Sequence, residues 1–216
     1  MEDKLSKYVV LDLEMCRVQK KVEKEGFRYA SELIQIGAVE MNERYEITRT
    51  FMTFVKPEFG ALDSFIRKLT GIKPSDLENA PVAAVALREF YDWLEEDSVF
   101  VTWSDSDAIQ IESELYFKDI DIPGYYRYID NYIDCQYLFA QMFDTLRQYN
   151  LTEALIIANI EYDLNVHDAF TDAKNTAALF VKLECCEDRA SFSPYYMTQE
   201  ESQSYIYNSF AARCTA

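Results

Sequence analysis

Two acidic side chains near the start of the chain are spaced to hold a metal ion. Asp12 and Glu14 follow the apolar run Tyr8–Leu11, which favours a β-strand. In a strand, side chains two residues apart share a face and lie about 7 Å from one another. Both carboxylates can therefore reach one hard divalent cation, and oxygen ligands of this kind suit Mg²⁺ or Mn²⁺.

A second chemically active group lies far downstream. His167, the chain's only histidine, stands five residues before Asp172, and Asp168 between them is a good N-cap for a helix. A lone histidine is more often structural than catalytic. With Asp168 as the cap, His167 lies on the preceding loop and Asp172 in the first turns of the helix, so the imidazole can approach a fixed carboxylate.

Two further aspartates, Asp105 and Asp107, follow the apolar run Ser98–Trp103. Either can supply a third carboxylate. Either can also cap the helix that begins there, which is the commonest role of an aspartate at such a boundary. The residues alone leave both alternatives open.

Charge is unevenly distributed along the chain. With 21 basic and 38 acidic residues the net charge is −17, whereas proteins that bind nucleic acid tightly usually carry a basic surface. One local cluster of cations comes directly after the Asp12 and Glu14 pair: Arg17, Lys20, Lys21, Lys24 and Arg28. From charge alone, a solvated hairpin loop is at least as good an interpretation of this cluster as a binding surface.

Composition predicts a soluble cytoplasmic protein with one main domain. The 216 residues, 49% of them hydrophobic, supply enough material for one core. Five irregularly spaced cysteines indicate neither a disulfide framework nor a zinc site. The sequence shows no signal-peptide pattern and no apolar run near the roughly 20 residues that span a bilayer, so we expect no membrane association.

The hydrophobic pattern predicts an α/β fold with a mixed sheet flanked by helices. Strands are expected at 8–13, 33–41, 47–55, 98–103 and 128–133, the first three as an antiparallel meander. Helices are expected at 62–71, 82–94, 108–115, 137–143, 152–160 and 168–183. The periodic pattern ends after Leu183, so we divide the chain into a domain at 1–183 and a C-terminal extension of unknown role at 184–216.

Three short motifs, in this order, resemble those of the DEDDh 3′-to-5′ exonucleases. They are Asp12-x-Glu14, then Trp103-Ser104 with an aspartate three residues later, and His167-x-Ala169-x-x-Asp172-Ala173. Supporting stretches at 31–39, 54–57 and 69–72 extend the resemblance over about residues 7–183. Within the family the chain is most similar to the branch that contains the KapD and Eri-type RNA exonucleases.

The resemblance implies an RNase H-like fold and a complete set of site residues. Alignment on Trp103 selects Asp107 over Asp105, so the implied ligands of two Mg²⁺ or Mn²⁺ ions are Asp12, Glu14, Asp107 and Asp172. His167 is the implied general base, since an imidazole titrates near neutral pH. The implied substrate is a single-stranded RNA or DNA 3′ end, contacted by Leu13, Glu14, Met15, Trp103, His167 and, in the cationic loop, Arg17, Lys20 and Lys21.

Two rival functions remain open on the sequence. The acidic composition suggests a non-catalytic nucleic-acid or protein binding module on the same fold, although all five implied site residues are present. The low basic content suggests a nuclease restricted to very short oligonucleotides, which need little cationic surface.

Overall fold

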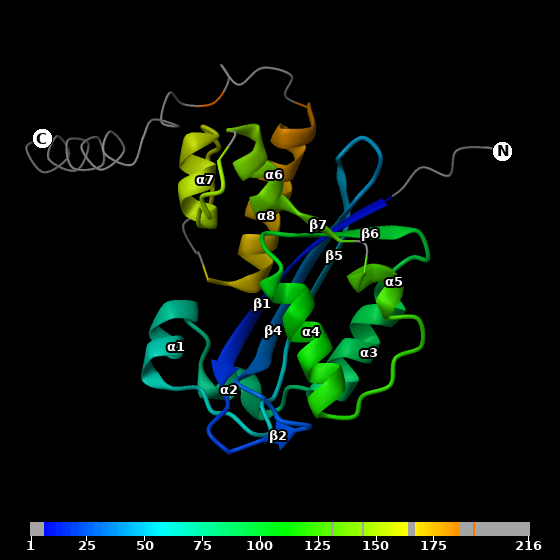
Figure 1. The fold of residues 1–216 in the computed structure, drawn as a ribbon, viewed down its shortest axis with the longest axis vertical. Coiled ribbons are helices and arrows are strands. Elements are labelled where there is room, and N and C mark those ends of the chain that lie inside the picture. The colour runs from blue at the N-terminus through cyan, green and yellow to red at the C-terminus, as the bar shows by residue number, and fades with distance from the viewer. Residues whose placement is uncertain (1–6, 131, 144, 164–166, 186–191, 193–216) are drawn as a thin grey trace, which may run out of the picture.

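A mixed five-stranded sheet forms the centre of the molecule (Figure 1). The computed structural model describes residues 7–130, 132–143, 145–163, 167–185 and 192. The strand order is β5-β4-β1-β6-β7, with bounds Ile47–Phe54, Ser31–Met41, Lys7–Arg17, Ser98–Thr102 and Ile133–Asp134. β4 pairs antiparallel with β1 and β5, whereas β6 runs parallel to β1 and β7. The predicted meander and the predicted mixed sheet are confirmed.

Helices cover both faces of this sheet. Val9, Leu11 and Leu13 of β1 share one core with α3 (Ala83–Trp93), α4 (Ser106–Phe117) and α5 (Tyr126–Ile129). Val10 shares the other core with α6 (Cys135–Met142), α7 (Leu151–Ile157) and α8 (Ala169–Cys185), which lie together at the top of Figure 1. Because side chains alternate along a strand, Asp12 and Glu14 lie on the same face as Val10. This is the face that α8 covers.

The predicted strand at 128–133 is wrong for most of its length. Residues Tyr126–Ile129 form α5, and the strand β7 contains only Ile133 and Asp134. The Tyr and Ile residues that favour a strand here pack instead as a helical turn, with Ile129 buried and Tyr128 stacked on Phe100. Tertiary packing therefore overrides local propensity at this point.

The predicted helices are present, and besides α5 there is one further short helix that was not predicted. α1 (Ser64–Thr70) is capped by the Asp63 side chain, which accepts hydrogen bonds from Phe65 N and Ile66 N. It ends at Gly71, whose φ of 74° lies in the left-handed region that favours glycine. A helix that was not predicted, α2 (Pro74–Glu78), follows it directly.

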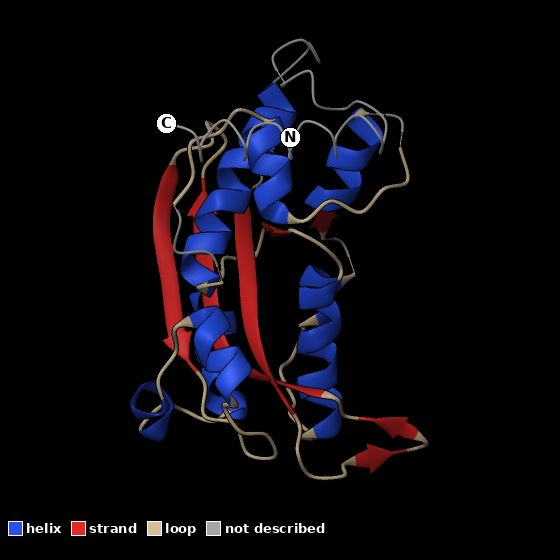
Figure 2. Ribbon diagram, turned by 90° about the vertical axis from the view of Figure 1, so that its left-hand side faces the viewer, coloured by secondary structure: helices blue, strands red, loops and turns tan. Residues whose placement is uncertain are grey.

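The cationic loop includes a small hairpin that projects from the body of the protein (Figure 2). Its strands are β2 (Glu23–Lys24) and β3 (Phe27–Arg28). Lys24 anchors it to α4, because its ammonium donates to the Tyr116 carbonyl oxygen and pairs with Asp119. The hairpin is therefore docked onto the domain.

The predicted C-terminal extension lies almost wholly outside the described residues. α8 continues to Cys185, and beyond it the structure describes only Phe192, which packs against Phe139 and Phe143. In the described part of the chain, no helix has the length and apolar character needed to cross a membrane.

Candidate active site

The centre of the candidate site is the end of β1 that extends beyond β6. Asp12 and Glu14 lie on the α8 face of this strand, with Gly37 and Gln35 of β4 directly across from them. The register between β1 and β4 shifts by one residue immediately after Glu14, where Met15 pairs with Leu33. Irregularities of this kind are common beside active sites, where they direct side chains.

The first turn of α8 sits on β4 at Gly37 and Gln35. A Cβ atom on Gly37 would lie 2.2 Å from the Phe170 nitrogen and 2.3 Å from the Ala169 carbonyl carbon, so only glycine allows this approach. Two residues away on the same face, the buried Gln35 side chain donates to Asp168 Oδ2 at 2.9 Å and accepts from Ala169 N at 3.2 Å. These contacts set α8 against Asp12 and Glu14.

Asp168 caps α8, as predicted, and Asp172 faces the site. The cap is a hydrogen bond of 3.0 Å from Thr171 N to Asp168 Oδ1. Asp172 Oδ2 accepts a hydrogen bond of 2.9 Å from the backbone nitrogen of His167, whose φ is 64°. Asp172 Oδ1 is buried and has no hydrogen-bond partner among the described residues. A buried carboxylate oxygen without a partner is costly unless a cation binds it.

Glu14, His167 and Asp172 form one cluster. One ligand atom from each of them lies within 4.8 Å of the others, which is close enough to share a metal ion. Glu14 and Asp172 are buried, whereas His167 is exposed at the rim. The sequence-predicted pairing of the strand acid with the downstream histidine and aspartate is therefore present in three dimensions.

Asp107 joins the site from α4 through the backbone of β1. The pairing of β1 with β6 ends at Val10 and Val101, so later N–H groups of β1 on that edge need another acceptor. Asp107 Oδ1 accepts the Leu13 N–H at 3.0 Å, and the residue is only 4% exposed. Asp105, the rival candidate, is exposed at the N-cap position of α4 and its side chain makes no cap hydrogen bond.

Burial raises the pKa of all four carboxylates, and neighbouring site carboxylates raise it further for Asp12 and Glu14. Burial, followed by the negative charges of Asp107 and Asp172, raises the pKa of Asp12 well above its ordinary value. Burial and the same neighbours raise the pKa of Glu14 to about 8. Burial raises the pKa of Asp107 to about 7, although the Leu13 hydrogen bond opposes this rise, and burial also raises the pKa of Asp172. A bound divalent cation would offset this shared negative charge.

The residues predicted to contact substrate are divided between core and surface. The Leu13 side chain is buried, and Trp103 packs on Phe139 with 9% of its surface exposed, so neither side chain offers much contact area. Met15 is half-buried beside the site. In the cationic hairpin region, Arg17 is exposed, Lys20 donates to the Glu58 carbonyl oxygen, and Lys21 pairs with Glu23 at 3.1 Å.

Sequence reasoning assigned no role to Gln35 or Gly37. A signal for Gln35 was available in the sequence, because it is a lone amide in the otherwise apolar run Leu33–Val39.

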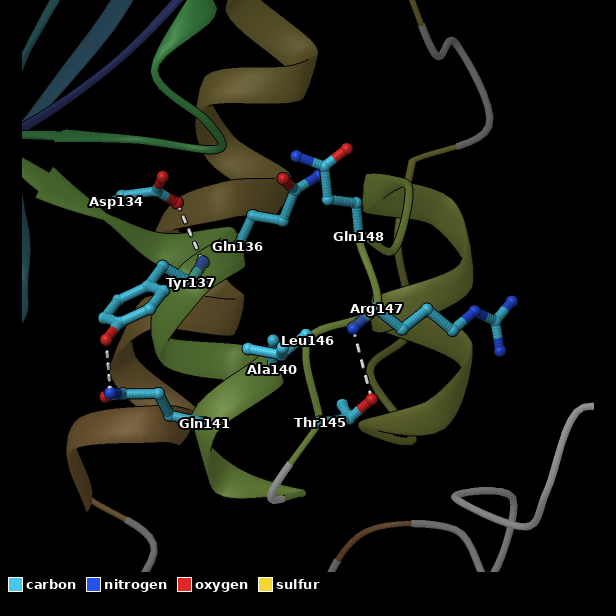
Figure 3. A pocket seen from close by; sticks show the side chains of 9 residues that line it. All are labelled: Asp134, Gln136, Tyr137, Ala140, Gln141, Thr145, Leu146, Arg147 and Gln148. Atoms are coloured by element: carbon cyan, nitrogen blue, oxygen red, sulfur yellow. Dashed lines mark hydrogen bonds between the residues drawn. The ribbon is translucent and has the colours of Figure 1, made fainter.

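A pocket of about 570 Å³ was also not predicted (Figure 3). It lies between α6 and the 145–148 segment, is lined by side chains such as Gln136, Tyr137 and Arg147, and contains none of the predicted site residues.

Solved structures identify the class of fold. The chain superimposes on the nuclease domain of 3′hExo, described as a DEDDh family member bound to rAMP, with a TM-score of 0.69 and 22% identity, covering 87% of this chain and 96% of that one. It also superimposes on Pop2p of S. pombe in a form that holds Mg²⁺ and Mn²⁺, with a TM-score of 0.61 and 16% identity, covering 83% of each chain. The fold is the RNase H-like fold of the DEDDh exonucleases.

The family follows from the sequence match. The family model RNase_T, described as Exonuclease, matches residues 9–180, and the chain belongs to this exonuclease family. Similar proteins include the 3′-5′ exonuclease Snipper of Drosophila melanogaster, 27% identical over 76% of this chain, and ERI1 exoribonuclease 2 of Xenopus laevis, 26% identical over 75%. A PolC-type DNA polymerase III of Caldanaerobacter subterraneus is 29% identical over 70%.

The chain spans only part of these relatives. It covers 64% of Snipper, 27% of ERI1 exoribonuclease 2 and 10% of the polymerase. The activities and substrates of those whole proteins therefore enter the description of this chain only as a proposal.

Proposed function

We propose that this chain is a metal-dependent exonuclease that removes nucleoside monophosphates from the 3′ end of single-stranded RNA or DNA. One observation carries the proposal: Asp12, Glu14, Asp107 and Asp172 come together from β1, α4 and α8, and the buried Oδ1 of Asp172 has no partner among the described residues. Family membership supports the reaction class, and the names of Snipper and ERI1 exoribonuclease 2 support 3′ polarity and RNA.

The donor set fits a pair of Mg²⁺ or Mn²⁺ ions. The ligands would be Asp12, Glu14 and Asp172, with Asp107 contributing through the oxygen that does not bind the Leu13 N–H. All are hard carboxylate oxygens, which these ions prefer. When bound, such a pair supplies activation of the attacking water and stabilisation of the leaving 3′ oxygen.

His167 is the proposed general base. Its imidazole lies beside Glu14 and Asp172 at the exposed rim, so it can take a proton from the attacking water and release it to solvent. The hydrogen bond from its backbone nitrogen to Asp172 holds His167 next to this proposed metal ligand. In this proposal His167 accepts the proton, and the neighbouring carboxylates of Glu14 and Asp172 bind the metal.

Very short oligonucleotides are a second candidate substrate, and the hairpin contacts favour it. Lys21 pairs with Glu23 and Lys24 with Asp119, so acidic neighbours already balance part of the cationic loop. Replacing Lys20, Lys21 and Lys24 by Ser separates the two candidates. If the loop guides long strands, the triple variant loses activity on a twenty-nucleotide strand, with a weaker salt dependence, but not on a dinucleotide.

The main experiment uses single-stranded RNA and DNA labelled at either end. We expect a ladder of products shortened from the 3′ end in Mg²⁺ or Mn²⁺ and none in chelator. Asp12→Asn should abolish the ladder, whereas the matched control Asp105→Asn should keep most of it, because Asp105 is exposed outside the cluster. Metal-independent cleavage, or equal activity of Asp12→Asn and wild type, would contradict the proposal.

A further inference from the structure

Gln35 makes two directed hydrogen bonds to the start of α8. Its side chain is fully buried in β4, directly across from Glu14. The Nε2 atom donates to Asp168 Oδ2 and the Oε1 atom accepts from Ala169 N. A carboxylate can only accept here and a backbone N–H can only donate, so the site requires one donor and one acceptor on the same side chain. The glutamine side chain carries both groups and is long enough to reach both partners.

The contact with Gln35 completes the bonding of Asp168. The other carboxylate oxygen of Asp168 accepts from Thr171 N in the N-cap of α8. Both oxygens of this aspartate are therefore engaged in holding the helix terminus. Asp172, one turn further along α8, has Oδ1 unbonded among the described residues.

Asp168 carries a second negative charge near the site. Both aspartates contribute to the raised pKa of Glu14, so both negative charges lie near it. Hydrogen bonds from groups around a metal centre fix the orientation of the carboxylates beside it. The structure supplies that restraint through Gln35 and the helix cap.

We infer that Gln35 is a positioning residue of the metal site, a role that rests on the proposed function: it fixes the N-terminus of α8 and holds Asp168 as a helix cap, so that Asp172 alone of the two faces the metal. Gly37 acts in the same place by letting the first turn of α8 approach β4. One residue binds the helix terminus, and the other leaves the space for it.

A charge-and-donor swap tests this inference. Gln35→Glu keeps the length and the acceptor for Ala169 N, but it loses the donor to Asp168 and sets two carboxylates against each other. Adding Asp168→Asn restores one donor and one acceptor with their direction reversed, and the new amide oxygen can still accept from Thr171 N. The four proteins, namely wild type, each single variant and the double variant, form a double-mutant cycle.

We expect Gln35→Glu to lower kcat in saturating Mg²⁺ at least tenfold, since a misplacement of about 1 Å can cost ~10²-fold. The released Asp168 carboxylate and the added charge should tighten Mn²⁺ binding, measured by calorimetry, at least threefold. The double variant should return kcat and the Mn²⁺ Kd to within threefold of wild type. Its Tm in chelator should return to within a few degrees of wild type. Gln35→Met, which adds no charge, should lower kcat without weakening Mn²⁺ binding.

A role in folding alone gives a different pattern, because partial unfolding weakens metal binding and activity together. Wild-type kcat in Gln35→Glu, parallel loss of Mn²⁺ affinity and Tm, or a double variant no better than the single one would overturn the inference. The Mn²⁺ titration needs no substrate. If the wild type hydrolyses nothing, the proposed function fails, yet the Mn²⁺ cycle still decides the role of Gln35.

Discussion

Gly37→Ala offers a sharp test of how the site is assembled, because it perturbs a catalytic centre without touching a proposed ligand. Gly37 lies across from Asp12, and a Cβ atom there would meet Phe170 N at 2.2 Å. Ordinary van der Waals contact begins near 3.4 Å, so α8 must move by about 1.2 Å away from β4. Asp172 would move with the helix.

The expected cost is larger for activity than for folding. A misplacement of about 1 Å can lower turnover ~10²-fold, whereas overpacking of this kind typically costs ~1–3 kcal/mol of stability. We therefore expect Gly37→Ala to remain folded at 25 °C, to lose about two orders of magnitude in kcat/KM on 3′ ends in Mg²⁺, and to bind Mn²⁺ more weakly.

Gly26→Ala is the matched control. Gly26 has a φ of 86° in the hairpin turn, and apart from its chain neighbours no described atom lies within 4 Å of the position that a Cβ would take there. The substitution therefore strains the backbone without displacing α8. A loss of Tm in both variants with a loss of activity only in Gly37→Ala supports the reasoning. If Gly37→Ala keeps kcat/KM and Mn²⁺ affinity within threefold of wild type, α8 does not set the site in the way described.

Three further predictions address individual residues. Asp107→Asn should lose most of its hydrolysis while Asp105→Asn loses less than threefold in the same assay, and the reverse order would move the third ligand to Asp105. His167→Ala should lower kcat by ~10²- to 10⁴-fold with little change in the Mn²⁺ titration, and near wild-type turnover would assign the base elsewhere. In chelator, the pKa of Glu14, raised to about 8 by burial, lets the folded state bind a proton that the unfolded state releases above its ordinary pKa of 4.5. The free energy of unfolding by urea should therefore be highest near pH 4.5 and fall as the pH rises to about 8, with a smaller fall in Glu14→Gln. Mn²⁺ affinity should rise over the same pH range, because the metal binds the deprotonated carboxylate. A free energy of unfolding that does not depend on pH would contradict this pKa.

Local sequence rules predicted the features that depend on short-range geometry. The two-residue period of a strand placed Asp12 and Glu14 on one face of β1, and the N-cap preference of Asp168 placed His167 before α8 and Asp172 within it. Each of these depends on a few neighbouring residues. The same rules failed at Tyr126–Ile129, where contacts with a distant strand selected a helical turn.

The features that could not be predicted depend on pairing between distant segments. Gln35 serves α8 because β4 pairs with β1 in one register and α8 crosses that pair, and a shift of one residue would turn Gln35 to the other face. The attachment of Lys24 to Asp119 likewise joins residues far apart in the chain. The cations of the loop and the nearby Glu23 were visible in the sequence, but the pairing of Lys24 with Asp119 was not.

We propose that carboxylates from three elements, β1, α4 and α8, form one metal site at which nucleic acid is shortened from the 3′ end. A direct test is the product pattern of a 5′-labelled single-stranded RNA incubated in Mg²⁺ with wild type and with Asp172→Asn. We predict a ladder of labelled strands shortened one nucleotide at a time for wild type and intact substrate for the variant, although both proteins are folded. Release of the labelled 5′ nucleotide first, or the same ladder from both proteins, would contradict the claim.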